Sequence, residues 1–162
     1  MPALRPAAPR RRGLVVLVTT AILLLGVVGA PGASAGPGAR ARMLDLINES
    51  RERHDLRVLK LNPALSEDAE RHTRKMLRQD RIFDPPNLEE ILSPYPYEHL
   101  GAAAVGCDDT LRALHRALMD SQVHRDIILH PDLRRVGIGV IRADERNLCG
   151  RDSFWVTELF YG

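Results

Sequence analysis

The stretch RVGIGVIRADERNLCGRDSFWVTELFY, residues 135–161, decides the fold class of this chain. Residues 135–142 and 153–161 are rich in β-branched and aromatic side chains, which favour extended strands. The charged segment between them predicts a loop, so the two runs form a strand–loop–strand unit. Gly137 and Gly139 lie inside the first run, where they indicate a close backbone approach or a bulge rather than a ligand loop.

Helical patterns precede this unit. Apolar residues recur at helical spacing in residues 40–54, 65–79 and from 111 onward, and a short helical turn is expected near 124–129. Residues 84–106 are expected to be a long connection with only a short helix at 88–92. Helices followed by paired strands predict an α+β fold, with helices packed on a small antiparallel sheet. The predicted core is formed by Leu111, Leu114, Leu118, Ile138, Val140, Trp155 and Val156.

Composition excludes several classes of protein. The 162 residues include 23 Lys and Arg against 21 Asp and Glu, a formal net charge of +2. Four of the arginines fall in residues 1–35, which hold no acidic residue, so the rest of the chain is slightly acidic. Such a chain does not neutralise a phosphate backbone, and a nucleic-acid partner is not expected. A hydrophobic share of 44% with 27% charged residues excludes disorder and a protein of several membrane spans.

The N-terminus has the pattern of an export signal. Arg10–Arg12 form a positive region, residues 14–28 are apolar, and Ala33-Ser34-Ala35 is a cleavage pattern of small residues. We therefore expect a signal peptide at 1–35, a linker at 36–42 and one domain at 43–162. The expected location is extracellular, without a stable transmembrane anchor after cleavage. The alternative is a protein anchored to the membrane by an uncleaved N-terminal segment.

The expected export bears on the oxidation state of the two cysteines. Cys107 and Cys149 are an even number of thiols in an oxidising compartment, which favours a disulfide that closes a loop of about 42 residues. The alternative is a pair of free thiols. Two isolated cysteines are poorly spaced for a metal site.

Motifs give no direct enzyme assignment. The sequence contains no nucleotide-binding glycine loop, no G-x-S-x-G and no H-E-x-x-H, and its serines have no obvious nucleophile context. His72 and His115 fall on or beside apolar helical stripes and are expected to be buried and hydrogen-bonded rather than to act as ligands.

The remaining candidates lie in and around the long connection. His99 follows Glu98 there, and His124 opens the short turn after the third helix. These residues and Asp84 could meet in one cleft, although spacing alone does not bring them together.

Three stretches in order resemble the CAP superfamily, the domain shared by cysteine-rich secretory proteins, antigen 5 and pathogenesis-related 1. LINESRERHDLRVLKLNPAL at 46–65 resembles the opening helix and the start of the second. Residues 69–76 follow the A-x-x-H-x-x-x-M rhythm, and SQVHRDIILHPDLRRVGIGV at 121–140 resembles the bacterial S-P-G-H-R segment with the strand behind it. The terminal FWVTELF is similar to the last core strand, so the resemblance covers about residues 43–162.

The resemblance implies an α-β-α sandwich with a solvent-filled cleft, whose histidines and glutamates can hold a divalent ion such as zinc. His124 matches the histidine of the H-R pair and Glu98 the glutamate of the family's G-E-N segment. Asp84 stands where the family has its second histidine, and His99 would be a fourth member if its loop turned inward. His124 and Glu98 are thus the implied metal ligands. With one imidazole, zinc binding is expected to be weak.

The implied function is that of a secreted binding module without enzymatic activity, which takes a lipid-like or other small molecule. An alternative is a hydrolase with Glu98 as base and His124 as acid or metal ligand. A third is a structural or defence-type module that acts through protein contacts. No catalytic residue is assigned, because family resemblance indicates fold better than function.

Overall fold

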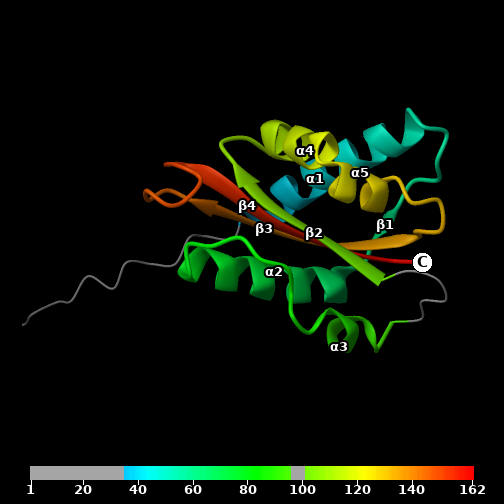
Figure 1. Cartoon of the computed structure of the whole chain (residues 1–162), viewed down its shortest axis with the longest axis horizontal. Coiled ribbons are helices and arrows are strands. Elements are labelled where there is room, and N and C mark those ends of the chain that lie inside the picture. Colours follow the sequence, from blue (N-terminus) through cyan, green and yellow to red (C-terminus); the bar gives the residue numbers. More distant parts are fainter. Residues whose placement is uncertain (1–34, 96–100) are drawn as a thin grey trace, which may run out of the picture.

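A four-stranded sheet lies between two layers of helices (Figure 1). The structure is a computed structural model that describes residues 35–95 and 101–162. On one face lie α1 (Gly36–Glu52), α4 (Leu111–Asp120) and α5 (Gln122–Ile128). On the other lie α2 (Pro63–Arg78) and α3 (Leu88–Leu92). This arrangement confirms the predicted α+β sandwich.

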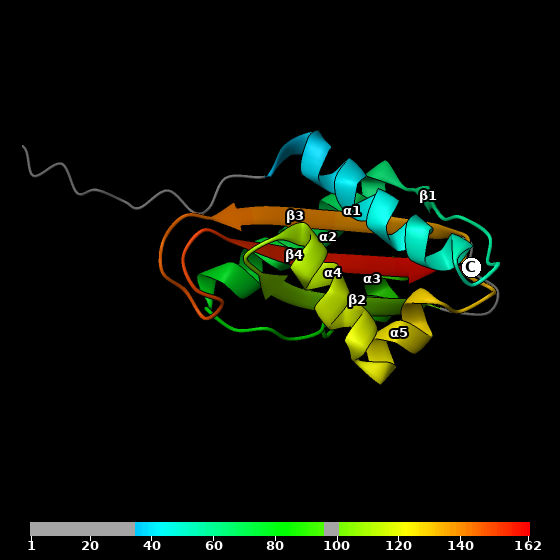
Figure 2. The same cartoon turned by 90° about the horizontal axis from the view of Figure 1, so that it is seen from above.

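The sheet has the strand order β1-β3-β4-β2. The strands are β1 (Lys60–Leu61), β2 (Gly101–Asp108), β3 (Arg135–Ala143) and β4 (Ser153–Tyr161). Strands β3 and β4 are antiparallel, as predicted, and β2 is antiparallel to β4. The two-residue β1 pairs in parallel with β3, so the sheet is mixed rather than purely antiparallel. Figure 2 shows α1 and α4 crossing above its strands.

Strand β2 corrects the expected long connection at 84–106. Its sequence, GAAAVGCD, consists mostly of Gly and Ala, which have low strand propensity. All eight residues nevertheless pair with β4, from Gly101 opposite Tyr161 to Asp108 opposite Phe154. Pairing with a neighbouring strand therefore overrides the local preference.

Residues 36–42, expected to be a linker, form the first part of α1. Ala and Arg, at positions 39–42, are strong helix formers. Ala35 and Ala39 also pack against the core, and the backbone N–H of Ala35 donates to the carbonyl of Val140 at 3.1 Å. In the uncleaved chain this contact with β3 stabilises a helix that begins four residues before the predicted start, and cleavage before Gly36 would leave the packing of Ala39.

The two faces of β3 bury different partners. Val136, Ile138 and Val140 belong to the core under α1 and α4. Gly137 and Gly139 face α2, and a Cβ at Gly139 would overlap backbone atoms of α2. The expected close backbone approach is confirmed, because α2 lies directly on these glycines. Of the seven predicted core residues all but Leu111, which is partly buried, are buried.

Side-chain hydrogen bonds hold the ends of the elements. The side chain of Asn62 accepts a hydrogen bond from Leu65 N–H at the start of α2, and Thr110 accepts one from Ala113 N–H at the start of α4. Asn48 of α1 accepts a bond from Leu59 N–H at 2.8 Å and donates one to the Leu59 carbonyl at 3.1 Å. These bonds fix the chain just before β1.

The predicted disulfide between Cys107 and Cys149 is present, with the two Cα atoms 6.0 Å apart. It ties the end of β2 to the loop between β3 and β4. Both cysteines pack against a small core cluster that includes Met76 and Trp155. In residues 35–95 and 101–162 the helices are too short or too polar to cross a bilayer.

Candidate functional site

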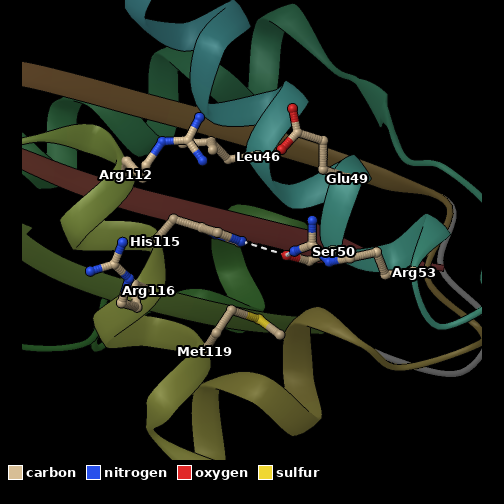
Figure 3. Close-up of a pocket in the computed structure, with 8 residues that line it drawn as sticks. All are labelled: Leu46, Glu49, Ser50, Arg53, Arg112, His115, Arg116 and Met119. Carbon is tan, nitrogen blue, oxygen red and sulfur yellow. Dashed lines mark hydrogen bonds between the residues drawn. The ribbon is translucent and has the colours of Figure 1, made fainter.

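A pocket of about 190 Å³ opens between α1 and α4 (Figure 3). Each helix lines it with four residues at positions i, i+3, i+4 and i+7, the spacing that places side chains on one face. The lining residues are Leu46, Glu49, Ser50 and Arg53 from α1 and its end, and Arg112, His115, Arg116 and Met119 from α4. The pocket therefore follows directly from two helices that pack side by side.

A hydrogen bond between the two helices lies in this pocket. Ser50 Oγ and His115 Nε2 are 2.8 Å apart, and the two residues are only 1% and 6% exposed. Arg53 Nη2 donates a second bond to Ser50 Oγ at 2.9 Å. The other ring nitrogen of His115, Nδ1, is buried without a hydrogen-bond partner among the described residues.

The charge of the pocket is positive. Burial, reinforced by Arg53 and Arg112 and opposed by Glu49, lowers the pKa of His115 to about 4, so its imidazole is neutral at neutral pH. Three arginines then face one glutamate. Arg112 and Arg116 form no ion pair with any residue in the described part of the chain, and both are exposed.

The Ser50–His115 pair has the spacing of a nucleophile and its base, but not their environment. Ser50 lies within α1, and burial of this residue makes its Oγ almost inaccessible to a substrate. The Nδ1 atom of His115 has no orienting carboxylate among the described residues, and an imidazole with a pKa of about 4 is a weak base. This geometry suits binding better than nucleophilic attack.

The described members of the predicted His/carboxylate cleft lie in different layers. His124 is half-buried on α5, which packs on the same sheet face as α1 and α4. Asp84 is exposed and follows Phe83, which packs against the α2 side of the sheet. Glu98 and His99 lie outside the described residues, so their meeting with His124 stays a prediction. Within the ranges described, no three His, Cys, Asp or Glu side chains are grouped to hold a metal ion; His124 and Asp84 alone do not fit one.

The other buried histidine has a structural role. His72 of α2 is 6% exposed, and its Nε2 lies 2.7 Å from the carbonyl of Phe83, whose ring packs edge-on against the imidazole. The prediction of a buried, hydrogen-bonded histidine is confirmed for both His72 and His115. A more open pocket of about 400 Å³ lies beside His72 between α2 and α3, with side chains of both charges around it.

Glu158, on the central strand β4, was not expected to be unusual. Its neighbours across the sheet are Ile138 and Ala104, and its face of the sheet carries Val156 and Phe160 of the core under α1 and α4. The residue is 0% exposed, and both carboxyl oxygens lack a hydrogen-bond partner among the described residues. Burial raises the pKa of this carboxyl to about 8, so it is largely protonated at neutral pH.

Sequence reasoning missed Ser50 and Glu158 for different reasons. The partner of Ser50 is 65 residues away, and only the packing of α1 on α4 brings the two together. Glu158 carried a usable signal, because a carboxylate on the same strand face as Val156 and Phe160 must point into the core.

Comparison with known proteins shows which family the chain matches. The family model described as the cysteine-rich secretory protein family, CAP, matches residues 44–160. The structure is similar to an outer surface protein from Borrelia burgdorferi, with a TM-score of 0.63 and 15% identity over 81% of this chain and 99% of that one. None of the curated proteins compared with the chain matches it.

Two other solved structures are similar. One is an extracellular protein containing an SCP domain from Bacillus anthracis str. Ames, with a TM-score of 0.58 and 18% identity over 75% of this chain and 40% of that one. The other is a cysteine-rich secretory protein from Staphylococcus aureus, with a TM-score of 0.60 and 22% identity over 77% of this chain and 39% of that one. The chain spans about two fifths of each of these two proteins. At such identities the likeness shows the fold alone.

Proposed function

The chain belongs to the cysteine-rich secretory protein (CAP) family, and on this premise we propose that it is an exported binding module, not an enzyme, that holds a small ligand between α1 and α4. A shared fold does not fix a function, so the support comes from the pocket itself. Concave sites with an apolar wall and a few oriented polar groups are typical of ligand binding.

One observation carries the proposal: the pocket has a base of hydrogen-bonded side chains and a rim of two arginines, Arg112 and Arg116, that form no ion pair among the described residues. Ser50 Oγ forms hydrogen bonds with both His115 and Arg53, and these two bonds hold the base of the pocket. The exposed guanidinium groups of Arg112 and Arg116 remain for a ligand. Leu46 and Met119 give the apolar contact that a lipid-like or other organic molecule needs.

The alternative hydrolase with His124 and Glu98 receives no support from the described residues. His124 lies on α5, outside the residues that line the pocket. The one serine–histidine pair of the pocket is closed to substrate by its burial.

Export is part of the proposal. It rests on the signal pattern at residues 1–35, of which 1–34 lie outside the described residues, and on the extracellular and outer-surface relatives of the fold. N-terminal sequencing of protein from the culture medium is expected to begin at Gly36. Only full-length protein in the membrane fraction would contradict cleavage.

Native mass spectrometry of the exported protein tests the binding role. We expect a fraction of the protein to carry a retained small molecule. Met119→Trp, which fills the pocket, should remove this adduct, whereas Leu148→Trp, at a residue that is 58% exposed and away from the pocket, should keep it. An adduct that survives in a folded Met119→Trp variant would place the ligand elsewhere.

A further inference from the structure

We infer that the pocket between α1 and α4 selects a ligand with a phosphate group in its doubly charged form. The inference rests on the proposed binding function and names the chemical class of the ligand. It is carried by the charge of the pocket and by the arginine donors that line it.

The net charge of the pocket is balanced by a ligand with two negative charges. Arg53, Arg112 and Arg116 contribute three positive charges, and Glu49 removes one. His115 is neutral, as its burial between these groups requires. The excess is therefore two positive charges, and a phosphate monoester carries close to two negative charges above its second pKa of about 6.

The donors also suit a phosphate. Arg112 reaches from α4 toward α1, while Arg53 turns back from α1 toward Ser50, with His115 between them (Figure 3). A guanidinium presents a rigid fork of N–H groups that matches phosphate oxygens two at a time. A carboxylate offers one charge and two oxygens, which would leave one guanidinium charge unneutralised.

The free anion and a lipid head group share this chemistry, so the experiment has two arms. Calorimetry measures the binding of inorganic phosphate and glycerol 3-phosphate to the full-length or exported protein. Co-sedimentation measures its binding to phosphatidylcholine vesicles with and without phosphatidic acid. We expect binding in at least one arm, and Arg112→Gln/Arg116→Gln should weaken it by about tenfold or more. Arg42→Gln, at an exposed arginine of α1 outside the pocket, is the matched control and should leave it unchanged.

Dependence on pH gives an independent readout. Phosphate affinity should rise severalfold between about pH 5 and pH 8 as the second proton leaves, whereas sulfate, which keeps two charges, should show no such rise. Arg112→Lys/Arg116→Lys keeps the charge without the fork and should bind with intermediate affinity.

Each outcome separates this inference from the proposed function. Phosphate binding that is lost with the two arginines supports it, and the responding arm identifies the source. Binding of laurate but of no phosphate ligand overturns the phosphate class and leaves the binding function standing. If nothing binds and native mass spectrometry finds no adduct, both are wrong. Phosphate binding that is equal in the double glutamine and Arg42→Gln variants overturns the assignment to this pocket.

Discussion

Ser50 on α1 and His115 on α4, 65 residues apart in the sequence, share a buried hydrogen bond of 2.8 Å that joins the two helices. The bond lies at the base of the pocket, so it links the packing of the two helices to the shape of the candidate site. Both partners are polar, and neither can turn to water, because they are 1% and 6% exposed.

Removal of one partner should therefore destabilise the fold. Ser50→Ala leaves Nε2 of His115 buried without a partner, which should lower the free energy of unfolding by about 1–3 kcal/mol. Urea denaturation measures the loss. Ser93→Ala, at an exposed serine, is the matched control and should change stability by less than about 0.5 kcal/mol. If Ser50→Ala behaves like this control, the bond does not stabilise the α1–α4 contact.

The buried carboxyl of Glu158 should give the free energy of unfolding an unusual dependence on pH. Its pKa is about 8 in the fold against an ordinary value of 4.5, so the folded protein binds more protons than the unfolded chain between these values. The free energy of unfolding from this group should then fall as the pH rises from about 4.5 to about 8, by up to about 1.4 kcal/mol per pH unit.

His115 acts in the opposite direction over part of this range. Its pKa of about 4 lies below the ordinary 6.5, so the stability it contributes is lost as the pH falls from about 6.5 toward 4. The contribution of Glu158 should thus appear most clearly between about pH 6.5 and 8. Glu158→Gln should raise stability at pH 8 and flatten the profile there, whereas Glu52→Gln, at an exposed residue of α1, should leave the slope in place. An unchanged slope in Glu158→Gln would show that the carboxyl is ionised and solvated in the fold.

How far the sequence predicts this molecule depends on the range of the interactions involved. The helical spacing in 40–54, 65–79 and from 111 onward and the β-branched and aromatic residues of 135–142 and 153–161 are local signals, and the corresponding elements are confirmed. Strand β2 was missed because its Ala and Gly residues are extended only through pairing with β4. The α1–α4 pocket was missed for the same reason, since its lining comes from two helices whose contact no local pattern encodes.

The disulfide between Cys107 and Cys149 should contribute to stability through its 42-residue separation. The chain-entropy argument gives about 4 kcal/mol for such a loop, and removal of natural disulfides lowers stability by about 2–5 kcal/mol. Differential scanning calorimetry with a reductant should therefore show a Tm lower by several degrees. Cys107→Ser/Cys149→Ser should match the reduced parent and show no response to reductant. A parent whose Tm is equally insensitive would contradict a stabilising bond.

Zinc binding tests the predicted role of His124. Because this residue and Asp84 lie in different layers, any site would depend on Glu98 or His99. We expect weak binding in calorimetry at neutral pH, and its loss in His124→Ala, since one imidazole with carboxylates is a poor zinc site. His54→Ala, at an exposed histidine of the segment after α1, is the control. Binding that persists in His124→Ala would remove His124 from the site.

Arg51 connects three segments of the chain from a fully buried position. Its Nε donates to the carbonyl of Arg57 at 2.8 Å, and its Nη1 donates to the carbonyls of Ile128 and His130 at 2.7 and 3.0 Å. These contacts join the end of α1 to the segment before β1 and to the end of α5. Burial, with a smaller effect from Arg134, lowers the pKa of the guanidinium, but a guanidinium remains charged in proteins. Carbonyl oxygens at the negative end of α5 compensate this buried charge.

Arg51→Lys keeps the positive charge and is therefore a test of geometry. A lysine presents its donors from a single nitrogen, which does not reach three carbonyls that lie on two separate segments. At least one carbonyl and part of the charge should be left uncompensated, so we expect a loss of about 3–5 kcal/mol in the free energy of unfolding. Arg57→Lys, at a neighbouring exposed arginine that contributes only its backbone carbonyl, should change stability by less than about 0.5 kcal/mol. Equal stability of the two variants would mean that water or a rearranged lysine satisfies the three carbonyls, and that Arg51 does not hold α5 against α1.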